Sequence, residues 1–186
     1  GNRFFPFYKK YPYMAVGKLY FTTFSGGGAY CTASVISPNN IIVTAAHCVY
    51  DTDADRLHSN WVFVPADRKG VAVYGAFPAT GYAYLTAWAT APNYNAGIHL
   101  DMALLELGNN RAGHTVTYYT GWLGRSWNYG YVQVLTDIGY PSNLWSGSLF
   151  TYINYAETYG CGTDRLCWGS KFGPGASGSP LIRKFR

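Results

Sequence analysis

Short apolar segments that end at turn-forming residues are the feature that most limits how this chain can fold. The stretches 25–28 (Ser-Gly-Gly-Gly) and 37–40 (Ser-Pro-Asn-Asn) each separate two such segments. Closely spaced short strands with Gly, Asn and Pro turns are typical of barrels and sandwiches. No long segment has the 3.6-residue apolar period of an amphipathic helix, which disfavours α/β architectures. We therefore expect an all-β fold, with one helical turn at 46–50 and strands over residues 14–21, 30–36, 41–44, 61–64, 71–74, 84–89, 102–107, 115–119, 130–136 and 149–154.

The composition suits a secreted β protein whose surface is polar through hydroxyl groups. Aromatic residues make up 18% of the chain and charged residues only 12%. The net charge of +5 comes from scattered basic residues, so we expect no nucleic-acid partner. No stretch approaches the roughly 20 apolar residues of a membrane span, so we expect no membrane partner. The chain begins at Gly1 without a signal sequence, and we expect that a targeting segment has been removed.

The four cysteines form two pairs that are local in the sequence. Cys31 lies close to Cys48, and Cys161 lies close to Cys167. Neither spacing is that of a zinc ribbon or a thioredoxin site, and the even number fits an oxidising compartment. We expect disulfides Cys31–Cys48 and Cys161–Cys167. The first would contribute about 3 kcal/mol in the chain-entropy model.

Three short motifs carry the residue types of nucleophilic catalysis. His47 stands in Thr-Ala-Ala-His-Cys, Asp101 stands in Leu-Asp-Met-Ala-Leu, and Ser177 stands in Gly-Ala-Ser-Gly-Ser-Pro. A serine hydroxyl is a poor nucleophile unless a base takes its proton, and a third group must hold that base. Asp101 begins an apolar segment, where a lone carboxylate is costly, so it needs a partner such as His47. His99 is a rival base, but its context is that of an ordinary surface histidine.

Small residues around Ser177 leave its hydroxyl accessible and allow backbone N–H groups to converge on an oxyanion. We expect the N–H groups of Gly175 and Ser177 to be those donors. The order His, Asp, Ser along the chain separates this set from α/β-hydrolases and subtilisins, which have other orders.

These motifs, with residues 12–19 and 33–40, resemble the chymotrypsin-fold (trypsin-like) serine peptidases. The resemblance is strongest to the secreted microbial branch that includes glutamyl endopeptidases, and it spans nearly the whole chain. It implies two six-stranded Greek-key β-barrels with the active site between them. It assigns His47 as the general base, Asp101 as the carboxylate that orients this base, and Ser177 as the nucleophile. The expected halves are residues 1–110, which carry His47 and Asp101, and residues 111–186, which carry Ser177.

Two departures from the family pattern matter. Ala176 stands where animal members have an Asp that pairs with a new N-terminal amine, so that activation ion pair cannot form. Only nine residues follow Ser177, whereas family members continue further. We therefore expect an incomplete second barrel, a cleavage point at Arg186, and a non-covalently bound C-terminal chain that completes the barrel.

Two further sites are weaker expectations. By the resemblance to trypsin-like enzymes, the residue six before the nucleophile lies at the floor of the specificity pocket. Here that residue is Lys171, beside Phe172, and its ammonium would attract an acidic substrate side chain. Asp51, Asp53 and Asp55 resemble the start of a calcium loop. The Gly and Glu that such a loop needs later are replaced by Arg56 and Val62, which favours an ordinary polar turn.

The sequence thus predicts a secreted serine endopeptidase that cleaves protein or peptide substrates through an acyl-enzyme and needs no cofactor or metal. One alternative is a catalytically inactive homologue that acts as an extracellular binding module through its Tyr and Trp residues. A second alternative is an esterase with the same triad.

Overall fold

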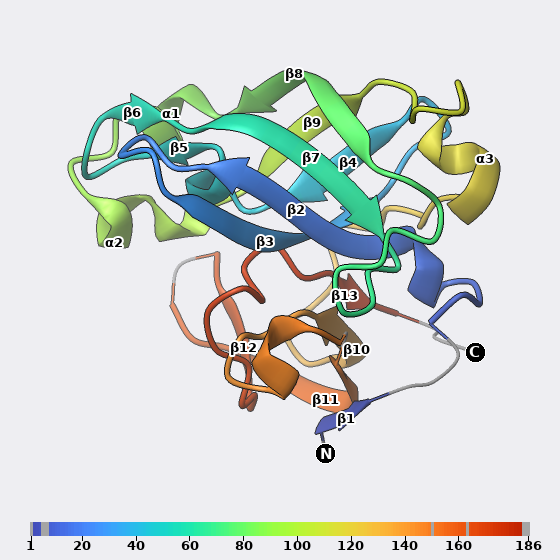
Figure 1. Cartoon of the computed structure of the whole chain (residues 1–186). Helices are drawn as coiled ribbons and strands as arrows, with labels where there is room; N and C mark the ends of the chain where they lie inside the picture. Colours follow the sequence, from blue (N-terminus) through green and yellow to red (C-terminus); the bar gives the residue numbers. More distant parts are fainter. Residues whose placement is uncertain (1, 5–7, 150, 163, 184–186) are drawn as a thin grey trace.

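The fold is mostly β, and its larger part is a barrel of six antiparallel strands. The computed structural model describes residues 2–4, 8–149, 151–162 and 164–183. The barrel closes in the order β2-β3-β4-β9-β8-β7 and occupies the upper part of Figure 1. Its strands are β2 (Val16–Thr22), β3 (Gly28–Val35), β4 (Ile41–Thr44), β7 (Ser59–Pro65), β8 (Phe77–Tyr84) and β9 (Ala103–Leu107).

Side chains that alternate along the strands fill the interior of the barrel. Along β9 the buried residues are Ala103, Leu105 and Leu107, with exposed residues between them, as expected for a strand with one face in the core. The core also holds Phe63, which is fully buried. Gly17 is required for closure, because a Cβ there would lie 2.3 Å from the Val64 carbonyl oxygen across the β2–β7 pair.

The second part of the chain forms a partial sheet below the barrel (Figure 1). The strands pair in the order β1-β11-β10-β13, and β12 pairs with the far end of β11. The two expected barrels are therefore present as one closed barrel and one partial sheet. The strands of this sheet are β1 (Asn2–Phe4), β10 (Val134–Gly139), β11 (Thr151–Gly160), β12 (Leu166–Trp168) and β13 (Leu181–Ile182).

The first strand belongs to the second sheet and not to the barrel. β1 pairs antiparallel with β11, in the register Asn2 to Ile153, so the N-terminus lies on the second sheet. The chain then enters the barrel at β2. This pairing ties both ends of the described chain to the same sheet, since β13 lies there too.

The remaining elements are short. The 3-10 turns are η1 (Tyr13–Ala15), η2 (Ala46–Cys48), η3 (Ile98–Leu100) and η4 (Trp145–Gly147). The helices are α1 (Thr86–Ala89), α2 (Tyr94–Gly97) and α3 (Val116–Thr120), and β5 (Tyr50–Asp51) pairs with β6 (Arg56–Leu57). No described helix has the length and apolarity that crossing a bilayer would demand.

Three expected strands are wrong, and tertiary packing explains two of them. Residues 116–119 lie in helix α3 instead, because the helical spacing buries Val116 and Thr120 together against the core. Within residues 84–89 the chain leaves β8 and forms α1, which buries Trp88. The Trp88 indole N–H donates to the Tyr50 carbonyl at 3.0 Å. Residues 71–74 contain only an isolated bridge between Val71 and Arg68.

Candidate active site

His47 and Asp101 meet at one end of the barrel. His47 lies in η2, directly after β4, and Asp101 follows η3 just before β9. The Asp101 carboxylate accepts the His47 backbone N–H at 2.9 Å and contacts Nδ1 of the ring at 2.7 Å. A carboxylate only accepts, so Nδ1 carries the ring hydrogen and Nε2 of the neutral ring is left as an acceptor. This is the tautomer that a general base toward a serine hydroxyl needs.

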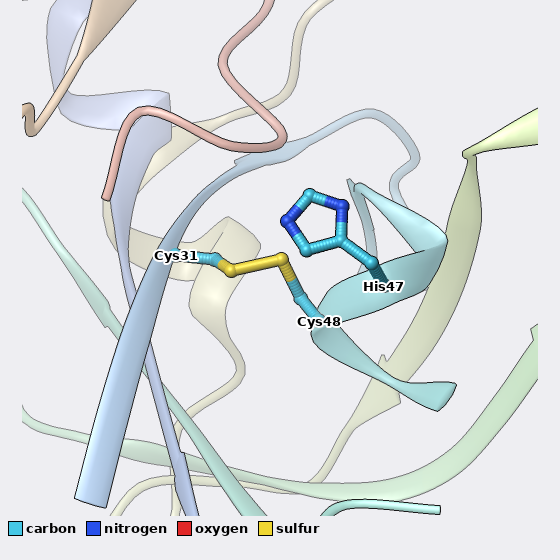
Figure 2. A group of neighbouring side chains, drawn as sticks. All are labelled: Cys31, His47 and Cys48. Carbon is cyan, nitrogen blue, oxygen red and sulfur yellow. A yellow bond between two sulfur atoms is a disulfide. The ribbon is translucent and has the colours of Figure 1, made fainter. Parts of the chain in front are cut away.

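A disulfide holds the backbone next to this ring. Cys31 of β3 is bonded to Cys48 of η2, and Figure 2 shows the His47 ring beside that bond. The second disulfide joins Cys161 to Cys167, so both pairs are those expected from the sequence. Cys31, His47 and Cys48 are the one group in the described chain whose ligand atoms lie close enough for a metal ion. They do not fit one, because disulfide sulfurs are not thiolate ligands.

The loop that carries Ser177 is attached to the barrel through Thr32. The Thr32 backbone N–H donates to the Ser177 carbonyl at 2.8 Å, and its hydroxyl donates to the Gly175 carbonyl at 2.8 Å. That hydroxyl also accepts the Tyr140 backbone N–H at 3.0 Å. Thr32 is fully buried on β3, one residue from the disulfide. One side chain thus fixes the serine loop against both parts of the fold.

Two glycines of the serine loop cannot be replaced without strain. Gly178 has φ +84°, and a Cβ there would lie 2.3 Å from the Thr32 carbonyl oxygen and 2.3 Å from the Thr44 hydroxyl. Gly175 has φ +90°, and its Cβ would lie 2.6 Å from the Tyr30 ring. Both positions combine a left-handed backbone with a close approach, which only glycine tolerates.

The serine loop also presents free backbone donors. The Ala176 N–H donates to the Gly173 carbonyl at 3.3 Å. Within the described chain, neither the Gly175 N–H nor the Ser177 N–H donates to a protein acceptor. These are the two donors expected to hold an oxyanion, and the conformation leaves both available.

The three proposed catalytic residues line one cleft between the barrel and the second sheet. It has a volume of about 1260 Å³ and is lined by His47, Asp101 and Ser177. Within the described chain, no hydrogen bond joins the Ser177 hydroxyl to His47. Such catalytic hydrogen bonds are often long before substrate binds. The cleft continues along Arg125 and Tyr129, where a longer ligand can extend.

A buried carboxylate lies beneath the serine loop. Asp137 of β10 is 1% exposed and accepts the Ser179 hydroxyl at 2.8 Å and the Trp168 indole N–H at 3.1 Å. Burial raises the pKa of Asp137 to about 6, while the bonds from Ser179 and Trp168 oppose that rise. Asp137 therefore connects β10, the serine loop and β12.

Several expected site residues lie elsewhere. Lys171 is exposed and does not line the cleft, so the described structure does not place its ammonium at a pocket floor. Its backbone carbonyl accepts the Asn143 side-chain amide at 2.8 Å. Phe172 is half-buried near Gly139 and also lies outside the cleft. His99 is exposed. Arg186 lies outside the described residues.

The three aspartates of the calcium-like motif do not converge. Asp51 accepts the Ala54 backbone N–H at 2.7 Å, and Asp53 accepts the Tyr94 backbone N–H at 2.9 Å. Asp55 accepts the Tyr50 hydroxyl. Each carboxylate accepts a hydrogen bond from a different residue, and the three are absent from the metal-compatible groups of the described chain.

Sequence reasoning missed three residues that shape the site. They are Thr32, the buried Asp137, and Tyr94, whose ring packs edge-on to His47 with centroids 5.7 Å apart. The sequence did give an indication of Asp137, because it is an acidic residue in an apolar segment, as Asp101 is. There was no such indication in the sequence for Thr32 and Tyr94, because a threonine in a strand is ordinary and Tyr94 is one of 18 tyrosines in the chain.

Comparisons with known proteins point to one family. The family model described as Trypsin matches residues 8–186. Glutamyl endopeptidase of Bacillus licheniformis is 27% identical over an alignment of 184 residues, and the match covers 94% of this chain and 50% of that protein. Extracellular metalloprotease of Bacillus subtilis is 29% identical over an alignment of 185 residues, and the match covers 94% of this chain and 53% of that protein. This chain spans about half the length of these curated relatives.

A solved structure extends the likeness to the fold. The crystal structure of protease Anisep from Arthrobacter nicotinovorans matches with a TM-score of 0.84 and 21% sequence identity. The match covers 100% of this chain and 82% of that one.

Proposed function

The chain belongs to the trypsin family of serine peptidases, and on that premise we propose that it is a secreted serine endopeptidase. The observation that carries the proposal is the His47–Asp101 pair, held at 2.7 Å in the same cleft as Ser177. The order of these residues along the chain and the two free N–H groups of the serine loop support it.

The proposed reaction is acyl transfer in two halves. Ser177 Oγ attacks the carbonyl carbon of the scissile peptide while His47 Nε2 takes the hydroxyl proton. The C–N bond then breaks, and His47 passes that proton to the leaving amine. Water, activated by the same ring, hydrolyses the acyl-enzyme and regenerates the serine. Asp101 holds the ring tautomer and stabilises the imidazolium.

The backbone N–H groups of Gly175 and Ser177 stabilise the oxyanion of each tetrahedral intermediate. One such donor is worth about two to three orders of magnitude in rate. Every proposed step uses groups of this chain, with a protein or peptide as substrate and no cofactor. Secretion is supported by the two disulfides, which form in oxidising compartments.

The experiment is labelling with a fluorophosphonate probe, followed by intact-mass measurement and peptide kinetics. We expect an adduct at Ser177 on the 20.5 kDa chain. Ser177→Ala should abolish labelling and lower kcat by at least about three orders of magnitude, while folding is kept. Ser126→Ala is the matched control, since Ser126 lines the same cleft. A folded, unlabelled wild-type chain would instead support the inactive binding module, and ester hydrolysis without peptide hydrolysis would support the esterase.

The second sheet supports a proposal about a partner. In the described chain β13 pairs with β10 along one edge and with no strand along the other. An unpaired strand edge is a template for another strand. We propose that a non-covalently bound C-terminal polypeptide completes this sheet. A smaller polypeptide that copurifies with the 20.5 kDa chain would support this, and a single species in a fully active sample would refute it.

A further inference from the structure

A second histidine lies beneath the proposed base. His58 connects β6 to β7, is 7% exposed, and packs its ring against the rings of Phe21 and Phe24. Its Nε2 lies 3.2 Å from the His47 carbonyl oxygen. Its Nδ1 accepts the backbone N–H of Phe24 at 3.0 Å. Both ring nitrogens therefore face backbone groups rather than solvent.

The two contacts determine the state of the His58 ring. A backbone N–H can only donate, so Nδ1 must be unprotonated. The neutral ring then carries its hydrogen on Nε2, which faces a carbonyl that can only accept. A protonated ring would place an N–H at Nδ1 against the N–H of Phe24. The neutral Nε2–H tautomer is the one state that satisfies both contacts.

His58 completes a set of bonds around the backbone of His47. Asp101 accepts the His47 N–H, and Trp61 donates its indole N–H to the next carbonyl, that of Cys48, at 2.9 Å. The His47 carbonyl itself is bonded by His58. We propose that His58 is a positioning residue that sets the backbone, and through it the ring, of the base; this inference rests on the proposed function.

The surroundings favour the neutral ring. Burial lowers the pKa of His58, and the imidazole of His47 adds to that effect. The hydrogen bond to the His47 carbonyl and the carboxylate of Asp51 act in the opposite direction. The charged and titratable groups that act on His58 are thus His47 and Asp51, on η2 and β5.

The first test does not depend on activity. In the Ser177→Ala protein, nitrogen NMR of the imidazoles should show His58 with a protonated Nε2 and an unprotonated Nδ1 at neutral pH. A hydrogen on Nδ1, or a charged ring at neutral pH, would overturn the proposal.

The second test compares two substitutions in the active chain. His58→Phe keeps an aromatic ring between Phe21 and Phe24 but loses both hydrogen bonds. We expect it to lower kcat about 10- to 100-fold with KM nearly unchanged, because misplacement of a catalytic group acts mainly on the chemical step. His58→Gln keeps a donor near the position of Nε2 and should retain kcat within a few-fold.

The outcomes separate this inference from the proposed function. Unchanged kcat in a folded His58→Phe protein would overturn the positioning role while leaving the peptidase intact. Loss of kcat in His58→Gln equal to that in His58→Phe would also overturn it, because the donor would then not matter. If His58→Phe does not fold, the NMR measurement still decides, and a loss of kcat of more than about ten-fold in a folded His58→Gln protein would overturn the role of the donor. A wild-type chain without activity would refute the peptidase, and the NMR test would remain.

Discussion

Asp137 makes the stability of this protein depend on pH in a direction opposite to that of most carboxylates. Its side chain is 1% exposed and accepts hydrogen bonds from Ser179 and Trp168. Burial raises the pKa of Asp137 from its ordinary 3.8 to about 6. In the unfolded chain the carboxyl loses its proton near 3.8, whereas in the folded chain it keeps the proton until about pH 6. The folded state therefore binds more protons between these two values.

The sign and size of this pH effect on the free energy of unfolding follow from proton linkage. Because the folded state holds the extra proton, the free energy of unfolding falls as pH rises from about 4 to about 6. One pH unit over this interval is worth about 1.4 kcal/mol, so Asp137 alone costs about 3 kcal/mol of stability once it is fully ionised. Almost complete burial of the side chain means that solvent screening reduces this figure little.

The assay is urea unfolding at a series of pH values, in a Ser177→Ala background that prevents self-digestion. Asp137→Asn removes the charge yet keeps the network, because the amide oxygen can accept from Trp168 and the amide nitrogen can donate to the Ser179 hydroxyl. The unfolding free energy of the parent relative to Asp137→Asn should fall by about 3 kcal/mol between pH 4 and pH 7.

A companion variant tests the cause. Ser179→Ala removes a hydrogen bond that favours the ionised form, so it should extend the falling part of the curve to higher pH. A difference curve between parent and Asp137→Asn that is flat from pH 4 to pH 7 would refute the reasoning. So would one that rises, since it would mean that the charged carboxylate is stabilised in the folded state.

Two other predictions concern the serine loop and the surface. Gly178→Ala should cost about 3 kcal/mol in urea unfolding, because it adds left-handed strain to a close contact of 2.3 Å with Thr32, and it should abolish probe labelling. Full labelling of that variant would contradict the tight docking of the loop. Lys171→Ala should leave kcat/KM for peptides with Glu before the scissile bond within about two-fold, because its side chain is exposed and outside the cleft. A selective loss of more than about ten-fold on the Glu peptide, with Arg, Phe and Ala peptides unaffected, would show that Lys171 contacts substrate after all.

Local patterns in the sequence were enough for the fold class, the cysteine pairs and the residues proposed for catalysis. Strand β4 was predicted at its observed bounds because four β-branched residues, three of them apolar, follow a turn and lead into the His47 motif. The cysteine pairs could be named because close spacing limits their partners. His47, Asp101 and Ser177 could be named because each stands in a short motif, and the structure brings them to one cleft.

Packing between distant segments decided the rest, because local propensity does not contain it. Residues 115–119 have strand-forming side chains, but the helix buries Val116 and Thr120 on one face. Lys171 matched a register counted from Ser177, yet the structure turns it to solvent, because a count of residues says nothing about where a loop leads. Thr32, Asp137 and His58 acquire their roles through partners 143, 42 and 11 residues away along the chain. Such contacts exist only once the barrel has closed and the second sheet has docked against it.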